Sequence, residues 1–192
     1  LPRPIKNKYI AFGVHSTSQL KFWNHSNGLK SQGDATNWNE LSAILRKRGY
    51  TPVTVEKEEM YGVPPFYNGV PSKSNKQIGK TLLDAVNIIN HSDFYIGLSS
   101  GMSWIAHALG KKVVMISNFT EDWNEFDLSL DDYIRITNKS VCHGCWNKVN
   151  IEHSFDKNDW YWCPKHKGTE RQFECHKSIT PEIVLEKIKH WL

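Results

Sequence analysis

Residues 93–116 read DFYIGLSSGMSWIAHALGKKVVMI, and this stretch determines the expected fold. Asp93 to Leu98 is an apolar run of strand length, and Ser99-Ser100-Gly101 predicts a tight turn. A helix is expected from Met102 to Leu109, and a second strand from Lys112 to Ile116. This order is a βαβ unit, so the two strands are expected to lie parallel in one sheet.

The flanking sequence repeats the same alternation of strands and helices. Further strands are predicted at Lys8–His15, Thr51–Val55 and Tyr133–Thr137. Helices are predicted from Asn37 to Gly49, from Ile78 to Ile89 and from Pro181 to Trp191, and residues 58–76 are predicted to be a loop. The expected fold is α/β, a Rossmann-like parallel sheet flanked by helices. Its ligand site should lie at the carboxyl ends of the strands, where loops 16–21, 56–62, 98–103 and 117–126 gather.

Length and composition favour one compact domain with a small appendage. The chain has 192 residues, and its net charge of +4 is scattered among 20 acidic residues. This charge is as consistent with a solvated surface as with an anionic ligand. No apolar run is long enough for a membrane span and no signal peptide is recognisable, so we expect a cytoplasmic protein without a membrane partner. Because the chain starts with Leu1 rather than Met, we expect it to be part of a longer polypeptide.

All four cysteines lie close together in the sequence, as C-x2-C followed by seventeen residues, a cysteine, eleven residues and a cysteine. Clustered thiols in a cytoplasmic protein indicate a metal site before they indicate disulfides, and two disulfides remain the alternative. Four thiolates make a tetrahedral cage that suits zinc or iron. We expect the ion to staple a small insertion, with the nearby histidines at the surface or beside the ligands. The predicted ligands are Cys142, Cys145, Cys163 and Cys175.

The turn after the strand at residues 93–98 predicts an anion site. Its N–H groups and the dipole of the following helix point to where a phosphate would bind, and Gly101 permits close approach. Lys21 follows the first strand and would supply a positive charge. Glu56 is either a ligand for ribose hydroxyls or a solvated acid, and His107 is expected to pack inward. The predicted binding residues are Thr17, Ser18, Lys21, Glu56, Ser99, Ser100, Gly101, Met102, Ser103, Asn118, Phe119 and Thr120.

Three segments resemble the bacterial autotransporter heptosyltransferases: GVHSTSQLKFWN (13–24), GLSSGMSWIAHALGKKVVMISNFTEDWNEF (97–126) and VCHGCWN…WCPKHKGTERQFEC (141–147 and 162–175). The resemblance implies the C-terminal half of a GT-B glycosyltransferase that binds ADP-heptose. It implies ferric iron on the four cysteines, with zinc as the alternative. It also implies a homo-oligomer, and an N-terminal domain outside this chain that carries the catalytic base.

The resemblance also implies roles for the predicted site residues. Lys21 and the 99–103 turn would hold the diphosphate, while Thr17, Ser18 and residues 118–120 would lie near the sugar and nucleoside. The implied function is transfer of heptose from ADP-heptose to a protein hydroxyl, such as a serine of an autotransporter. The alternative is a metal-ribbon module that binds nucleic acid or protein without catalysis. Under the favoured interpretation no nucleic acid partner is expected.

The expected organisation has three parts. Residues 1–140 form the nucleotide-sugar-binding domain, residues 141–178 the four-cysteine knuckle, and residues 179–192 a helix that packs on the sheet. No catalytic residue is assigned within the chain, and Glu121, Asp122 and Glu125 are poor substitutes for the missing base. Residues 24–36 and 58–74 depart from the family pattern as enlarged or unusual loops, which bears on the identity of the sugar and the acceptor.

Overall fold

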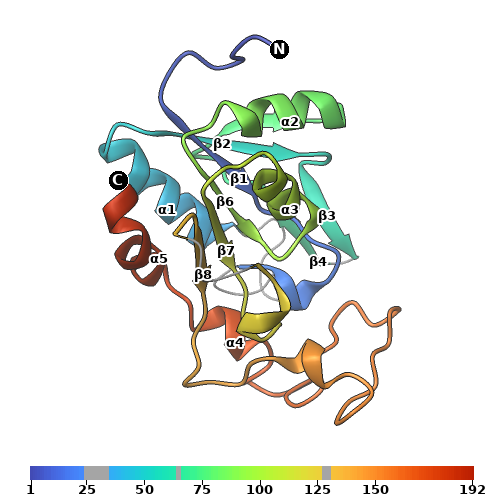
Figure 1. Cartoon of the computed structure of the whole chain (residues 1–192). Coiled ribbons are helices and arrows are strands. Elements are labelled where there is room, and N and C mark those ends of the chain that lie inside the picture. The colour runs from blue at the N-terminus through green and yellow to red at the C-terminus, as the bar shows by residue number, and fades with distance from the viewer. Residues whose placement is uncertain (24–34, 64–65, 127–130) are drawn as a thin grey trace.

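A computed structural model of the chain describes residues 1–23, 35–63, 66–126 and 131–192 (Figure 1). Most of the segment 24–36, predicted to be an enlarged loop, lies outside the described residues. Among the helices of the described ranges, none is both long and apolar enough to cross a membrane.

The core of the fold is a six-stranded sheet in which every neighbouring pair is parallel. The strand order is β5-β2-β1-β6-β7-β8. This arrangement confirms the predicted Rossmann-like α/β class. The bounds are β1 Tyr9–Gly13, β2 Thr51–Glu56, β5 Asn75–Ile78, β6 Tyr95–Leu98, β7 Val113–Ile116 and β8 Tyr133–Ile136.

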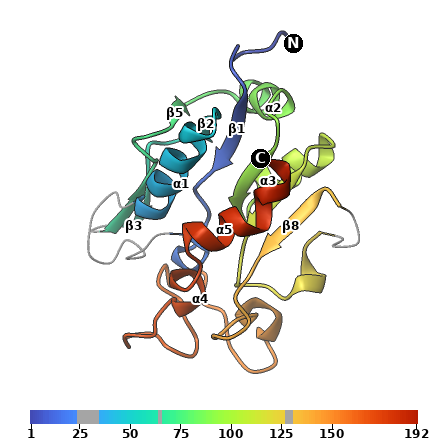
Figure 2. The same cartoon turned by 90° about the vertical axis from the view of Figure 1, so that its left-hand side faces the viewer.

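Helices cover both faces of the sheet because the side chains of each strand alternate between them. In β1, Ile10 and Phe12 pack in the cluster that contains residues of α1 (Thr36–Lys47) and α5 (Pro181–Ile188). Tyr9 and Ala11 point to the other face, toward α2 (Leu82–Asn90) and α3 (Gly101–Ala108). The result is a three-layer sandwich of helices, sheet and helices. Figure 2 shows α1 and α5 together on one side of the sheet.

The prediction that residues 58–76 form a loop is wrong. An antiparallel hairpin of β3 (Met60–Val63) and β4 (Phe66–Gly69) occupies most of it, and β5 begins at its end. The helix predicted to start at Ile78 is also misplaced, since Ile78 ends β5. The helix begins after Thr81, whose side chain and Asp84 form a reciprocal capping box.

The four-cysteine segment lies beyond the carboxyl ends of the strands (Figure 1). Its short elements are η3 (Cys145–Lys148) and α4 (Glu174–Lys177). Two further 3-10 helices follow β1 and β7, η1 (Gln19–Lys21) and η2 (Asp122–Asn124), and η4 (Lys189–Trp191) ends the chain.

The strand order reverses between β1 and β6. The chain moves from β1 outward to β2 and β5 on one side, and from β6 to β7 and β8 on the other. The loops that leave β1 and β6 therefore diverge to opposite faces and open a crevice between them. Parallel α/β sheets bind ligands at this point, outside the carboxyl ends of the strands.

Candidate functional site

Two adjoining clefts lie at this crevice, and Thr17 and Lys21 border both. The first cleft has a volume of about 490 Å³ and is lined by His15, Ser16, Thr17, Lys21, Glu56, Lys57, Glu58, Tyr61, Ser100, Gly101 and Met102. The second cleft has a volume of about 310 Å³ and is lined by Thr17, Ser18, Lys21, Ser99, Phe119, Thr120, Asn124, Glu125, Trp146 and Phe155.

Lys21 is a desolvated cation at the junction of the two clefts. Its Nζ lies 5.1 Å from the centroid of the Phe119 ring, which favours the ammonium by a cation–π interaction. Burial lowers the pKa of Lys21, and the nearby Glu125 carboxylate opposes that shift. A cation with so little water around it attracts an anionic ligand more strongly than an exposed lysine does.

The amino-terminal end of α3 opens onto the first cleft. Gly101 begins the helix and Ser100 caps it without a side-chain hydrogen bond. The first N–H groups of a helix have no partner inside it, and the helix dipole makes this end attractive to anions. Apart from its chain neighbours and the backbone of its own helix, no heavy atom lies within 4 Å of the place a Cβ on Gly101 would occupy. A phosphate therefore has both donors and space at this end of the helix.

Glu56 is not the solvated acid considered above. Its Oε1 accepts hydrogen bonds from the backbone N–H groups of Val14 at 2.5 Å and His15 at 2.9 Å. Burial nevertheless raises the pKa of Glu56 to about 7 and lowers that of His15 to about 4. His15 Nδ1 lies 3.7 Å from Glu56 Oε2. Because the pKa of His15 is lowered, the imidazole is neutral at pH 7, so this contact is not an ion pair.

Glu56 also borders a third cleft of about 250 Å³, between the end of β2 and the start of α2. Met102 and Lys57 line both this cleft and the first one. The third cleft is mostly apolar, with Val55, Leu82 and Ala85 in its walls. A ligand that lies across the crevice can therefore place a flat apolar group beside the Glu56 carboxyl.

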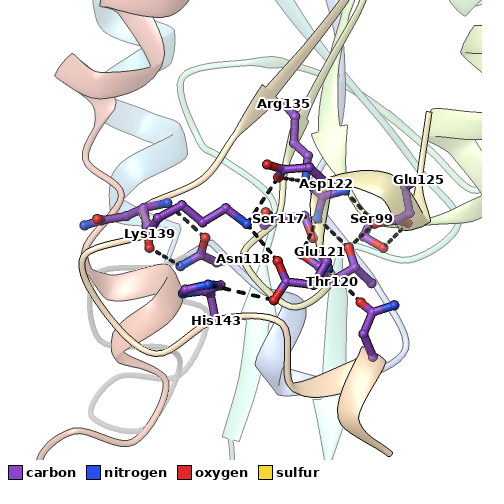
Figure 3. Close-up of polar contacts among 12 residues, drawn as sticks. Ser99, Ser117, Asn118, Thr120, Glu121, Asp122, Glu125, Arg135, Lys139 and His143 are labelled. Atoms are coloured by element: carbon purple, nitrogen blue, oxygen red, sulfur yellow. Dashed lines mark hydrogen bonds and ion pairs between the residues drawn. The ribbon is translucent and has the colours of Figure 1, made fainter. Parts of the chain in front are cut away.

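A buried polar network holds the loop after β7 (Figure 3). Glu125 accepts hydrogen bonds from Ser99 Oγ at 2.6 Å and Thr120 Oγ1 at 2.5 Å. Arg135 of β8 lies 3.4 Å from Glu125 Oε2 and donates to the carbonyl oxygen of Thr120 at 2.7 Å. Because both charged side chains are nearly fully buried, their pairing fixes the loop that lines the second cleft.

Most of the predicted binding residues lie together around the two clefts. Ser103 and Asn118 are exceptions, since neither lines them. Ser103 donates from Oγ to the carbonyl oxygen of Leu98 at 2.6 Å, and the Asn118 amide makes two hydrogen bonds to the backbone of Asn138. Both are buried and brace the backbone of the crevice. His107, predicted to pack inward, is partly exposed and contacts Tyr133 through Nδ1.

The four cysteines gather in one cluster with Leu20, Phe119, Trp162 and Phe173. Burial raises the pKa of Cys145 to about 12, with the neighbouring Cys142 adding to the shift. The pKa values of Cys163 and Cys175 are raised for the same reason, and nearby thiols add to each shift. Adjacent thiolates in such a site need a bound cation to balance them.

One pair of the predicted ligands has the sulfur spacing of a metal site. Cys142 Sγ and Cys145 Sγ lie 3.9 Å apart, close to the ~3.8 Å expected between two sulfurs bound at ~2.3 Å to one tetrahedral ion. Among the described residues, the donor atoms of Cys142, His166 and Glu174 also lie within 4.8 Å of one another, a tighter group than any three of the cysteines form.

Glu174 already has other partners in that group. Arg171 donates to both of its carboxylate oxygens, at 2.8 Å and 2.7 Å, and the backbone N–H of Cys142 donates to it at 3.2 Å. The hydrogen bond from Arg171 is the main cause of a lowered Glu174 pKa. We therefore assign Glu174 to the support of Cys142, and the thiols remain the better set of ligands.

Trp146, Phe155 and Arg135 contribute to the site but were not predicted from the sequence to do so. Trp146 and Phe155 of the four-cysteine segment line the second cleft, and Arg135 and Glu125 form the buried pair behind it. Arg135, in the middle of a short strand next to apolar residues, was the available signal, because a buried arginine requires a partner.

Comparison with known proteins gives relatives over nearly the whole chain. The autotransporter heptosyltransferase TibC of Escherichia coli is 37% identical over 93% of this chain and 41% of its own length. The autotransporter heptosyltransferase BAHTCr of Citrobacter rodentium is 37% identical over 93% of this chain and 40% of its own length. No family model matches the chain.

A crystal structure of TibC superimposes on the same range. It is described as a dodecameric iron-containing heptosyltransferase in complex with ADP-D-β-D-heptose. The TM-score is 0.85 at 36% identity, and the match covers 99% of this chain and 46% of that one. The chain thus spans less than half the length of the relatives it matches. It is a homologue of the autotransporter heptosyltransferases and corresponds to one Rossmann-like part of them.

Proposed function

We propose that this chain is the donor-binding part of a glycosyltransferase that holds ADP-heptose. The observation that carries the proposal is the position of Lys21, at the junction of two clefts and at the strand-order reversal beside the start of α3. A cation and free N–H groups facing one space suit a diphosphate. The likeness to TibC, solved with ADP-D-β-D-heptose, supports the choice of ligand.

The chemistry of this chain would be to stabilise the leaving group. When the bond between the sugar and the diphosphate breaks, negative charge develops on ADP. The Lys21 ammonium and the N–H groups at the start of α3 would stabilise that charge. The acceptor hydroxyl needs a base, which we place in an N-terminal domain outside this chain. Glu56, next to the third cleft, would hydrogen-bond the ribose hydroxyls.

The remaining parts of the proposal concern the acceptor, the assembly and the metal. The names of the relatives point to a protein hydroxyl of an autotransporter as acceptor, and the dodecameric state of TibC to a homo-oligomer. The iron of TibC points to iron as the ion on Cys142, Cys145, Cys163 and Cys175, with zinc as the alternative. Such an ion would cross-link the segment, and no step of the transfer is assigned to it.

Calorimetry tests the donor site. We expect ADP to bind, and ADP-heptose to bind more tightly than UDP- or GDP-linked sugars. Lys21→Ala removes the charge on the diphosphate, so the Kd for ADP should rise by about tenfold or more. Lys47→Ala, on α1 and away from these clefts, is the matched control and should leave that Kd unchanged.

Two results would contradict the proposal. The first is failure of the unaltered protein to bind any of these nucleotides. The second is an unchanged Kd for ADP in Lys21→Ala, which would place the diphosphate elsewhere. Metal analysis of the purified protein is a separate test, for which we expect about one iron ion per chain.

A further inference from the structure

The four-cysteine segment contributes an apolar wall to the second cleft. Trp146 directly follows Cys145, and both Trp146 and Phe155 line this cleft. Their exposed fractions are 38% and 40%, whereas Phe119 and Trp162, the rings on either side of them, are each 5% exposed. Two aromatic side chains are thus left open on the wall of a concave site, where an apolar ligand surface can cover them.

These rings belong to a continuous row between the cysteine cluster and Lys21. Trp162 lies 5.3 Å from Phe155, Phe155 lies 5.2 Å from Trp146, and Trp146 lies 5.3 Å from Phe119, measured between ring centroids. Phe119 in turn lies under the Lys21 ammonium. The edge-to-face geometry of the first two contacts is the arrangement that aromatic pairs favour. The row therefore holds the open face of Trp146 in one place.

Backbone hydrogen bonds attach Trp146 to the loop after β7. The Gly144 N–H donates to the carbonyl of Asn118 at 2.9 Å, and the Trp146 N–H donates to that of Phe119 at 3.0 Å. Gly144 has a φ of +67°, and a Cβ there would lie 1.9 Å from Glu121 Oε1. The left-handed φ favours glycine at this position. The position of Trp146 relative to the cleft is set by the backbone as well as by packing.

The other walls of the second cleft are polar. Glu125, Asn124, Ser99, Thr17 and Ser18 line them. The Glu125 carboxylate is held by Ser99 and Thr120 and keeps acceptor capacity for a ligand hydroxyl. A sugar ring has the matching surface, with hydroxyl groups at its edge and C–H groups on its faces. The negative face of an aromatic ring attracts these C–H groups.

We propose that Trp146, backed by Phe155, is the platform on which the sugar ring of the donor packs, so that the four-cysteine segment helps to determine which sugar is accepted. This inference rests on the proposed function. With the diphosphate at Lys21, the nucleoside lies in the first and third clefts and the sugar in the second. Trp146 is then a specificity-determining residue, and it directly follows the predicted metal ligand Cys145.

Calorimetry with two ligands tests this role. ADP lacks the sugar, so Trp146→Ala should leave the Kd for ADP within about twofold while raising the Kd for ADP-heptose about tenfold. Trp146→Phe keeps an aromatic face and should lose only about threefold. Trp123→Ala is the control, because Trp123 is 76% exposed, adjoins Asn124 and does not line the cleft. It should change neither Kd.

The outcomes separate this inference from the proposed function. An unchanged Kd for ADP-heptose in Trp146→Ala would overturn the inference, and so would an equal loss of both ligands, which would show a general structural role. Unaltered ADP binding in Trp146→Ala also shows that the variant is folded. Failure of the unaltered protein to bind ADP would overturn the proposed function, and this inference with it.

Discussion

The proposed diphosphate site leaves little room for a side chain at Gly101. Gly101 is the first residue of α3, and open space surrounds the place a Cβ would take. Its φ is not in the left-handed region, so an alanine fits the backbone. The glycine is therefore not required by the fold itself. We propose that it leaves room for a ligand that approaches the backbone closely.

Gly101→Ala should consequently separate stability from binding. The free energy of unfolding should stay the same or rise by about 0.5 kcal/mol, because alanine restricts the unfolded chain. The Kd for ADP should rise, because the methyl group occupies space needed by the diphosphate. Urea unfolding and calorimetry on the same preparation measure the two effects. Loss of stability together with unchanged ADP affinity would contradict this explanation.

Glu56 gives a prediction about pH. Burial raises its pKa from 4.5 to about 7, so the folded protein binds a proton here that the unfolded chain has released. The stability that this proton confers is present below pH 4.5 and is lost as pH rises to about 7. The glutamine of Glu56→Gln does not titrate, so the variant does not lose stability at this position as the pH rises. Relative to the unaltered protein, the variant should therefore gain up to about 3 kcal/mol between pH 4.5 and 8.

Denaturant unfolding of both proteins across that range is the measurement. His15 has a pKa lowered to about 4, and its own contribution rises with pH, opposite to that of Glu56. Since His15 is present in both proteins, the difference between them isolates Glu56. A difference that does not vary with pH would show that Glu56 is ionised in the folded protein throughout.

At the scale of elements, Arg135 of β8 connects the sheet to the loop that lines the second cleft. Its side chain is 3% exposed, and that of Glu125 is 9% exposed. Removal of one partner leaves the other charge buried, so Arg135→Met should lower the free energy of unfolding by about 3 kcal/mol or more. Addition of Glu125→Gln should restore part of that loss. Strictly additive effects of the two changes would show that the pair does not interact.

The strands and helices with apolar patterns were predictable, and the polar ones were not. The βαβ unit at residues 93–116 lies where its pattern placed it, because both of its strands are buried. Asn75-Lys76-Gln77-Ile78 is the polar edge strand β5, and polar residues are tolerated at an edge that only one neighbour pairs. Ile78 and Leu82 also happen to lie at helical spacing, which extended the predicted helix into the strand.

The candidate site was predictable where it follows from topology. Strand order and the turn after β6 led to Lys21 and Gly101, which the structure brings to the same cleft. Trp146 and Phe155 lie far from that turn in the sequence, and no periodicity shows that the four-cysteine segment folds back over the loop after β7. The division at residues 140 and 178 stays a prediction.

For the whole molecule, the four-cysteine segment should be the part whose order depends on metal. Its short elements have few residues to pack, whereas the sheet has its own core on both faces. A chelator, or Cys175→Ser, should release the ion and make residues 141–178 susceptible to a protease while the sheet stays folded. Limited proteolysis with mass spectrometry of the fragments checks this. Cleavage spread evenly over the sheet and the segment would contradict it.

We propose above that the diphosphate of a nucleotide-sugar lies between Lys21 and the start of α3. A crystal structure of this protein with bound ADP tests it most directly. We expect phosphate oxygens within hydrogen-bonding distance of Lys21 Nζ and of the N–H groups of Gly101 or Met102, with the second cleft left for the sugar. A bound ADP whose diphosphate touches neither Lys21 nor the first turn of α3 would contradict it.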